Sequence, residues 1–143
     1  MAPTNPVAML IPLGGIALIL AVVWLIGGAR RARLDRALVL RRLDEDLPGF
    51  AAAEVSIDGD AAAAIAATAD GASLALIFAA GDKVVVRPLV PRDIKRVAQQ
   101  PMRDGVRLVI ETGDFTHGRF ELRLSSAEAA RWQARLPAPA CAA

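Results

Sequence analysis

An uncharged stretch over residues 7–28 runs directly into an arginine-rich segment, and this junction constrains the chain more than any other feature. As a helix rising about 1.5 Å per residue, the stretch is about 33 Å long, enough to cross the hydrocarbon core of a bilayer. Pro12, Gly14 and Gly15 would weaken a helix in water but are tolerated in a membrane span. The stretch therefore predicts a single transmembrane helix.

A cleaved secretory signal is the competing interpretation of residues 7–28. Such a signal carries its basic residues before an apolar core of about 7 to 15 residues and ends at a small-residue cleavage site. Here the basic residues follow a longer core, so an uncleaved anchor is the favoured prediction. Ala17 and Ala21, with Gly14 nearby, form a small-xxx-small pattern on which a second helix could pack, although ordinary apolar filler explains the pattern more simply.

The charges beside the span predict its orientation. Arginines flank only its C-terminal end, and basic flanks stay on the cytoplasmic side of a membrane. The tail 1–6 is therefore expected outside, and the rest of the chain in the cytoplasm beneath an inner membrane. An indole near the basic end suits the membrane interface. The residues assigned to the interface and to topology are Trp24, Arg30, Arg31, Arg33 and Arg36.

A basic juxtamembrane helix is predicted over residues 29–47. Four apolar residues share one face of its 3.6-residue pattern: Leu34, Ala37, Leu38 and Leu43. We expect this helix to continue the membrane span, with a bend at Gly27 and Gly28, and to end at Pro48. Its arginines act as a topology signal, and near a surface each could also contribute about 1 kcal/mol of attraction to anionic lipids.

After residue 50 the apolar period shortens to two, and turn residues recur about every ten positions. Seven short strands are expected, over 53–57, 61–69, 73–79, 83–89, 94–99, 106–112 and 119–124, although the alanines of 61–69 also suit a helix. A capping box, Ser125 and Glu128, opens a final helix with Trp132 on its apolar side. The predicted fold is mainly β, a seven-stranded antiparallel barrel or sandwich closed by a C-terminal helix.

Seven strands followed by one helix resemble the pleckstrin-homology (PH) superfold, particularly small bacterial PH-like domains attached to membrane helices. The resemblance covers about residues 51–136. Besides topology it rests on the segment 86–97, where a strand ends in a polar turn before Asp93-Ile94-x-x-Val97. The resemblance implies a cytosolic docking module without a shared catalytic apparatus. A disordered Pro/Ala tail, 137–143, is expected to follow.

Residues 51–143 carry eleven basic and eleven acidic side chains, so the predicted domain is neutral and the pI near 9.3 comes from the juxtamembrane arginines. With few aromatic residues for base stacking, this composition argues against nucleic-acid binding. Cys141 stands alone, which excludes an internal disulfide. His117, the single histidine, has no companion set of metal ligands, and no nucleotide-binding motif occurs, so we expect no metal and no cofactor.

A run of cations around the fourth and fifth strands is the one charge cluster that could form a site. Its members are Lys83, Arg87, Arg92, Lys95, Arg96 and Arg103. If they converge, they could hold a phosphate, a lipid headgroup or an acidic segment of a partner. Otherwise they form a solvated face of a neutral domain.

These observations favour a non-enzymatic function. The leading hypothesis is a single-pass inner-membrane protein that presents a cytosolic PH-like binding or scaffolding module to a protein partner of a membrane complex. The alternative is a sensor of anionic lipid headgroups or of a phosphate ligand, using the cation run. A more distant alternative is a small hydrolase built on His117 and Asp114, for which no marked nucleophile is found.

Overall fold

The computed structural model describes residues 6–28, 31–113 and 118–137. Arg30, Asp114, His117 and Cys141 lie outside these ranges, as do residues 1–5 and 138–143 of the two predicted tails. Helix α1, Pro6–Val23, passes through Pro12 without a break and continues into a π-helical turn, Trp24–Gly28.

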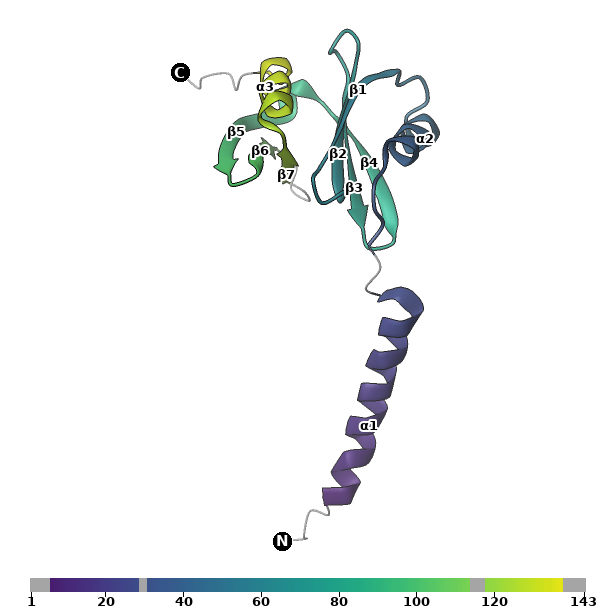
Figure 1. Cartoon of the computed structure of the whole chain (residues 1–143). Helices are drawn as coiled ribbons and strands as arrows, with labels where there is room; N and C mark the ends of the chain where they lie inside the picture. The colour runs from purple at the N-terminus through teal and green to yellow at the C-terminus, as the bar shows by residue number, and fades with distance from the viewer. Residues whose placement is uncertain (1–5, 29–30, 114–117, 138–143) are drawn as a thin grey trace.

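The N-terminal helix is confirmed as long and apolar enough to cross a bilayer. The span Pro6–Ile26 has a mean hydropathy of 2.6, and none of its residues is buried against the rest of the chain. In Figure 1 it stands apart from the folded domain. Trp24, at the end nearer the domain, is 70% exposed, as an indole at a membrane interface would be in the absence of lipid.

All seven predicted strands are present. They are β1 Ala52–Ile57, β2 Ala63–Thr68, β3 Leu74–Ala80, β4 Lys83–Leu89, β5 Ile94–Met102, β6 Gly105–Thr112 and β7 Arg119–Leu124. Every pairing is antiparallel, in a four-stranded sheet of order β1-β2-β3-β4 and a three-stranded sheet of order β5-β6-β7. The described residues form no closed barrel, so the two-sheet arrangement is the one found.

The core between the sheets is closed by helix α3, Ser126–Arg135. Apolar residues of both sheets meet there, among them Ile65, Leu76 and Leu108, together with the fully buried Trp132. The predicted capping box is confirmed, because the Glu128 amide donates to the Ser125 hydroxyl and the Ser125 amide donates to the Glu128 carboxylate.

The helix predicted over 29–47 is shorter than expected. Helix α2, Arg36–Asp46, begins after Asp35, whose carboxylate accepts a 2.7 Å hydrogen bond from the Leu38 amide. Residues 31–35, here called the linker, are not helical. The amide of Ala32 donates to the carbonyl of Gly81 at 2.8 Å, and that of Leu34 to the carbonyl of Ala61 at 2.7 Å. Gly81 and Ala61 lie in turns of the sheet, and their carbonyls accept from amides that a continuous helix would have paired within itself.

Helix α2 covers the outer face of the four-stranded sheet and builds a second core there (Figure 1). Val39 and Leu43 are its buried residues, at 0% and 1% exposure. Of the predicted apolar face, Leu38 is only half-buried and Ala37 is exposed. Because Asp35 sets where the helix starts, the face turned to the sheet centres on Val39, a residue that the pattern had not selected.

Candidate docking pocket

The two ends of the four-stranded sheet lie at different distances from the N-terminal helix α1. Five residues separate Ile26 from Ala32, so the linker lies at most about 20 Å from the end of the span. Ala32 is bonded to Gly81 in the β3–β4 turn, which we call the linker end of the sheet. From there β4 runs about 20 Å to Leu89, at the pocket end. Figure 1 shows the β3–β4 turn as the part of the sheet nearest α1.

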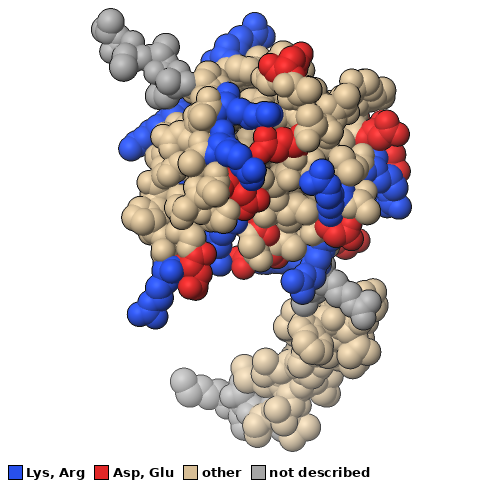
Figure 2. Space-filling view, turned by 45° about the horizontal axis from the view of Figure 1, so that its top comes forward, with Lys and Arg blue, Asp and Glu red and all other residues tan. Residues whose placement is uncertain are grey.

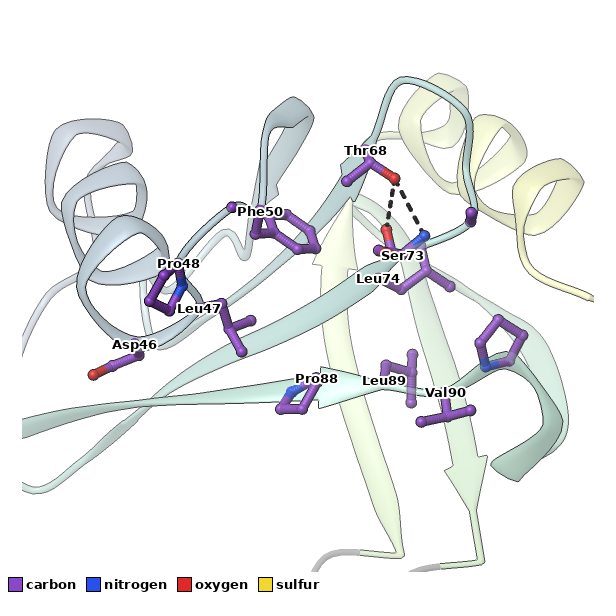
Figure 3. Close-up of a pocket in the computed structure, with 13 residues that line it drawn as sticks. Asp46, Leu47, Pro48, Phe50, Thr68, Ser73, Leu74, Pro88, Leu89 and Val90 are labelled. Carbon is purple, nitrogen blue, oxygen red and sulfur yellow. Dashed lines mark hydrogen bonds between the residues drawn. The ribbon is translucent and has the colours of Figure 1, made fainter.

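A pocket of about 460 Å³ opens at the pocket end. Three segments that are distant in sequence line it: the chain after α2, the β2–β3 turn and the end of β4. In Figure 3, Leu47, Phe50 and Leu74 lie opposite Pro88, Leu89 and Val90. The full lining is Asp46, Leu47, Pro48, Gly49, Phe50, Thr68, Ala72, Ser73, Leu74, Pro88, Leu89, Val90 and Pro91.

A tight turn after α2 builds the first wall. The amide of Leu47 donates to the carbonyl of Leu43 at 2.9 Å, which ends the helix, and Pro48 cannot continue it. Gly49 has φ +87°, a conformation in which glycine is favoured. The amide of Phe50 then donates back to the carbonyl of Leu47 at 3.0 Å, so the turn holds the phenyl ring over the pocket.

Hydrogen bonds stiffen the opposite wall, the β2–β3 turn. The Thr68 hydroxyl bonds to both the amide and the carbonyl of Ser73, at 3.2 and 3.3 Å (Figure 3). The Asp70 carboxylate accepts from the Thr68 hydroxyl and from the amide of Ala72. These two donors lower the pKa of Asp70 below its ordinary value of 3.8, and therefore this carboxylate of the β2–β3 turn is ionised at neutral pH.

The α2 side of the pocket is also acidic. Asp44, Glu45 and Asp46 occupy the last turn of α2, which holds no basic residue at its final positions. Carboxylates there oppose the helix dipole, at a cost of about 0.3 to 1 kcal/mol each. Glu45 pairs with Arg41 and Arg42, whereas Asp46 lies at the rim with its carboxylate turned away from the apolar lining (Figure 3). Of these three carboxylates, only that of Asp46 belongs to a residue that lines the pocket.

The structure does not gather the six predicted cations onto one surface. Lys83 lies at the linker end of β4, whereas Arg92 follows the opposite end of that strand. Arg103 lies in the β5–β6 turn, about 25 Å along β5 from Lys95 and Arg96. In Figure 2, Lys and Arg side chains alternate with Asp and Glu over the face in view, and α1 carries neither.

Each of the six has its own surroundings. Arg87 lines a small hollow with Thr112 and Phe120, and Arg92 lies 4.0 Å from Asp93 in the 3₁₀ turn Pro91–Asp93. The remaining four, Lys83, Lys95, Arg96 and Arg103, are exposed. This distribution fits the solvated-face interpretation better than a convergent anion site.

The arginines assigned to topology also separate. Arg31 and Arg33 are exposed on the linker. Arg36 instead starts α2 and lines a polar hollow with Glu54, Glu128, Arg131 and Arg135, among others. Glu54 pairs there with Arg131 at 3.6 Å and with Arg135 at 3.2 Å. Because Glu54 belongs to β1 and both arginines belong to α3, these ion pairs join α3 to β1.

The proposed hydrolase pair, His117 and Asp114, lies outside the described residues and stays a prediction. Within the described ranges, no group of three or more His, Cys, Asp or Glu side chains could hold a metal ion. The docking pocket itself was missed at the sequence level. Of its lining residues, Pro48 was identified only as the point where the predicted juxtamembrane helix ends.

No known protein family matches this chain, and no curated protein and no solved structure matches it. A function is therefore inferred from the chain's own residues.

Proposed function

We propose that this chain is a single-pass inner-membrane protein, with its N-terminus outside, whose cytosolic domain docks a protein partner. The observation that carries the proposal is the position of the docking pocket. It opens at the end of the four-stranded sheet remote from the linker, and is therefore accessible from the cytosol when α1 lies in the membrane. A pocket of about 460 Å³ with a mainly apolar lining accommodates a few side chains of a partner.

The proposal includes a PH-like domain of the membrane-attached bacterial kind. Its support is the order of elements, seven antiparallel strands followed by a closing helix, on which the sequence resemblance rests. Two features go beyond that resemblance. The segment 31–47 joins the domain through α2, and the docking pocket depends on the turn that follows this helix.

The chemistry of the docking pocket specifies its occupant. Proline, leucine, valine and phenylalanine side chains line it, so the inserted group is apolar. Asp46 lines it, and Asp44 and the ionised Asp70 each lie within two residues of a lining residue, so these carboxylates attract cations to its surroundings. The occupant is therefore a segment with an apolar side chain flanked by lysine or arginine. Placing Asp44 and Asp46 against the helix dipole costs stability in α2, and such conflicts are expected at functional surfaces.

Site-specific photocrosslinking in native membranes tests this proposal. A photoreactive amino acid replaces Val90, which is 39% exposed at the pocket, and in a matched control it replaces Met102, which is 37% exposed at the far end of β5. We expect one defined protein to crosslink from position 90 and not from position 102. Binding of that protein, once purified, should weaken at least tenfold with Val90→Asp and change little with Met102→Asp. Equal crosslinking at the two positions, or no effect of Val90→Asp, would contradict the proposal.

A second candidate function, contact with anionic lipid headgroups, has its own supporting observation. The bond between Ala32 and Gly81 brings the linker, with exposed Arg31 and Arg33, to the end of the sheet that carries exposed Lys83. These cations lie closest to the span and could contribute about 1 kcal/mol each at an anionic surface. A spin label at position 82 of the full-length protein in nanodiscs, in a Cys141→Ala background, should approach the headgroups only when anionic lipid is present. Substituting all three cations by glutamine should remove the difference.

A further inference from the structure

The exposed edges of the two sheets differ in how they are protected. β1 and β5 each carry an irregularity in register near their first residues, and β5 adds Lys95 and Pro101. The outward groups of Arg123 on β7 are occupied, since its amide donates to Asp58 and its carbonyl accepts from Gly59. Such devices discourage pairing with another strand. β4, the remaining edge, also carries charged residues and a proline, Lys83, Arg87 and Pro88, but its register with β3 has no irregularity.

β4 pairs with β3 in continuous register over seven positions, Leu74–Ala80 with Lys83–Leu89. Ala80 and Lys83 close a two-residue turn and so exchange hydrogen bonds, and the alternation that follows directs the backbone groups of Val84, Val86 and Pro88 away from β3. Pro88, which has no N–H, suits such an outward position. Among the described residues, no backbone hydrogen bond from turns, loops or caps reaches these three residues.

We propose that the edge of β4 binds an extended segment of the partner protein as an added strand, and that this segment ends with its apolar side chain in the docking pocket. Val84 and Val86 offer two outward N–H donors, and Val84, Val86 and Pro88 offer three outward carbonyl acceptors. This spacing, at every second residue, matches another extended backbone. The last residues of β4, Pro88 and Leu89, line the docking pocket, so edge and pocket form one continuous surface. This inference rests on the proposed function, and adds the conformation of the partner and the path it follows.

A second copy of this chain fits the β4 edge less well than another protein. Two β4 strands related by a twofold axis would run antiparallel, with Gly81 of the second copy beside Leu89 of the first. The linker of the second copy, which bonds to its own Gly81, would then attach about 27 Å along the strand from Gly81 of the first copy. With β4 along the membrane normal, this distance exceeds the full reach of residues 26–32, about 20 Å, and the π-helical turn ending at Gly28 shortens that reach.

The test uses the full-length protein in nanodiscs and peptides selected against it from a displayed library of random sequences. The selected peptide is synthesised with single N-methyl groups along its length, each of which removes one backbone donor. Val86→Pro removes an outward donor of β4 and spares the donors to β3, and Val86→Thr is the matched variant that keeps the donor. Circular dichroism and a denaturation midpoint establish that both variants fold.

We expect N-methylation to abolish binding at every second peptide position, and Val86→Pro to weaken binding by up to about tenfold, as loss of one backbone hydrogen bond would. Val86→Thr should change affinity less than threefold. If Val90→Asp blocks the peptide but the N-methyl scan shows no alternation, the docking pocket is used without the edge and this inference is wrong. If no peptide is selected, both the inference and the proposed function are contradicted. A disulfide-linked dimer through Val85→Cys in the Cys141→Ala background would identify a second copy as the occupant and overturn the choice of partner, because residue 85 of each copy would lie opposite the other.

Discussion

The indole Nε1 of Trp132 donates a 2.8 Å hydrogen bond to the hydroxyl of Ser56, although the two residues lie 76 positions apart in the chain. Both are almost completely buried, at 0% and 2% exposure. The Ser56 hydroxyl donates in turn to the carboxylate of Glu128, at 3.3 Å, and Glu128 also closes the capping box with Ser125. This chain of polar contacts fastens the closing helix to β1 and specifies its rotation.

Ser56→Ala should destabilise the domain, because it leaves the buried indole N–H of Trp132 without an acceptor. A lost partner of this kind costs about 1 to 3 kcal/mol. Denaturant unfolding of the full-length protein in nanodiscs, followed by Trp132 fluorescence in a Trp24→Phe background, measures the change. Ser126→Ala, at an exposed position, should leave the midpoint nearly unaltered. A Ser56→Ala midpoint equal to that of the parent would show that water replaces the hydroxyl.

Glu128 should make the domain less stable in acid. Burial alone would raise its pKa, but the hydrogen bonds from Ser125 and Ser56 and the charge of Arg131 outweigh burial and lower the pKa below the ordinary 4.5. A lowered folded-state pKa adds stability above the unfolded-state pKa, and this stability is lost as the pH falls through the folded-state value. Glu128→Gln should therefore unfold with a shallower pH dependence below about pH 4.5.

Acid titration of the unfolding free energy checks this prediction. Glu45→Gln, on the exposed side of α2, is the control for a carboxylate that makes no contact with α3. If Glu128→Gln and the parent lose stability in parallel on acidification, the Glu128 contacts do not differ between the two protonation states.

Gly105→Ala should strongly destabilise the β5–β6 hairpin. Gly105 has φ +138°, and a Cβ there would lie 2.5 Å from the carbonyl oxygen of Leu124. Backbone strain together with overpacking predicts a cost of about 2 to 5 kcal/mol. Gly71→Ala, at φ +68° with open space around the new methyl group, should cost only about 1 to 2 kcal/mol. Equal losses in the two variants would mean that the β7 backbone moves aside at little cost.

The orientation of the anchor is tested with reporters fused after Ala143. Because the arginines follow the span, a reporter active only in the cytoplasm should be active, and a phosphatase active only outside should be inactive. Release of a shortened, soluble protein to the outside would instead identify the N-terminal helix as a cleaved signal.

Ala32→Pro should loosen the linker, because it removes the N–H that donates to Gly81. The stability cost should be about 0.5 to 1.5 kcal/mol, the value of one backbone hydrogen bond. The amide of Leu34, bonded to Ala61, should then exchange its hydrogen faster. Residue-resolved hydrogen exchange in nanodiscs measures this, with Ala32→Ser as the variant that keeps the donor. Unchanged exchange at Leu34 would show that the two bonds form independently.

The strands could be predicted from sequence because each signal is local. Alternation of apolar and polar residues and the turns at Gly71, Gly81 and Gly105 lie within about ten residues of the pairs that they specify. The capping box of α3 is equally local, and it too was found. Even the ambiguous alanine-rich segment became a strand, β2, because neighbouring strands pair with it on both sides.

The role of α2 and the existence of the docking pocket could not be predicted in the same way. Asp35 was visible as a charge, but its choice as helix cap depends on the linker reaching Gly81 and Ala61, which are distant in sequence. Phe50, Leu74 and Val90 become neighbours only when α2, β3 and β4 are assembled. No local sequence pattern predicts contacts between segments this far apart in the chain.

In a membrane-anchored form of this protein, the hydrogen bond between Ala32 and Gly81 limits how far the docking pocket can lie from the bilayer. With the linker tied to the sheet, the docking pocket lies about 20 Å along β4 from the point where the linker joins the domain, and at most about 40 Å from the end of the N-terminal helix. A partner segment held farther from the bilayer than this could not reach the pocket. Proteins that present their segment within this distance are favoured before any side-chain contact forms.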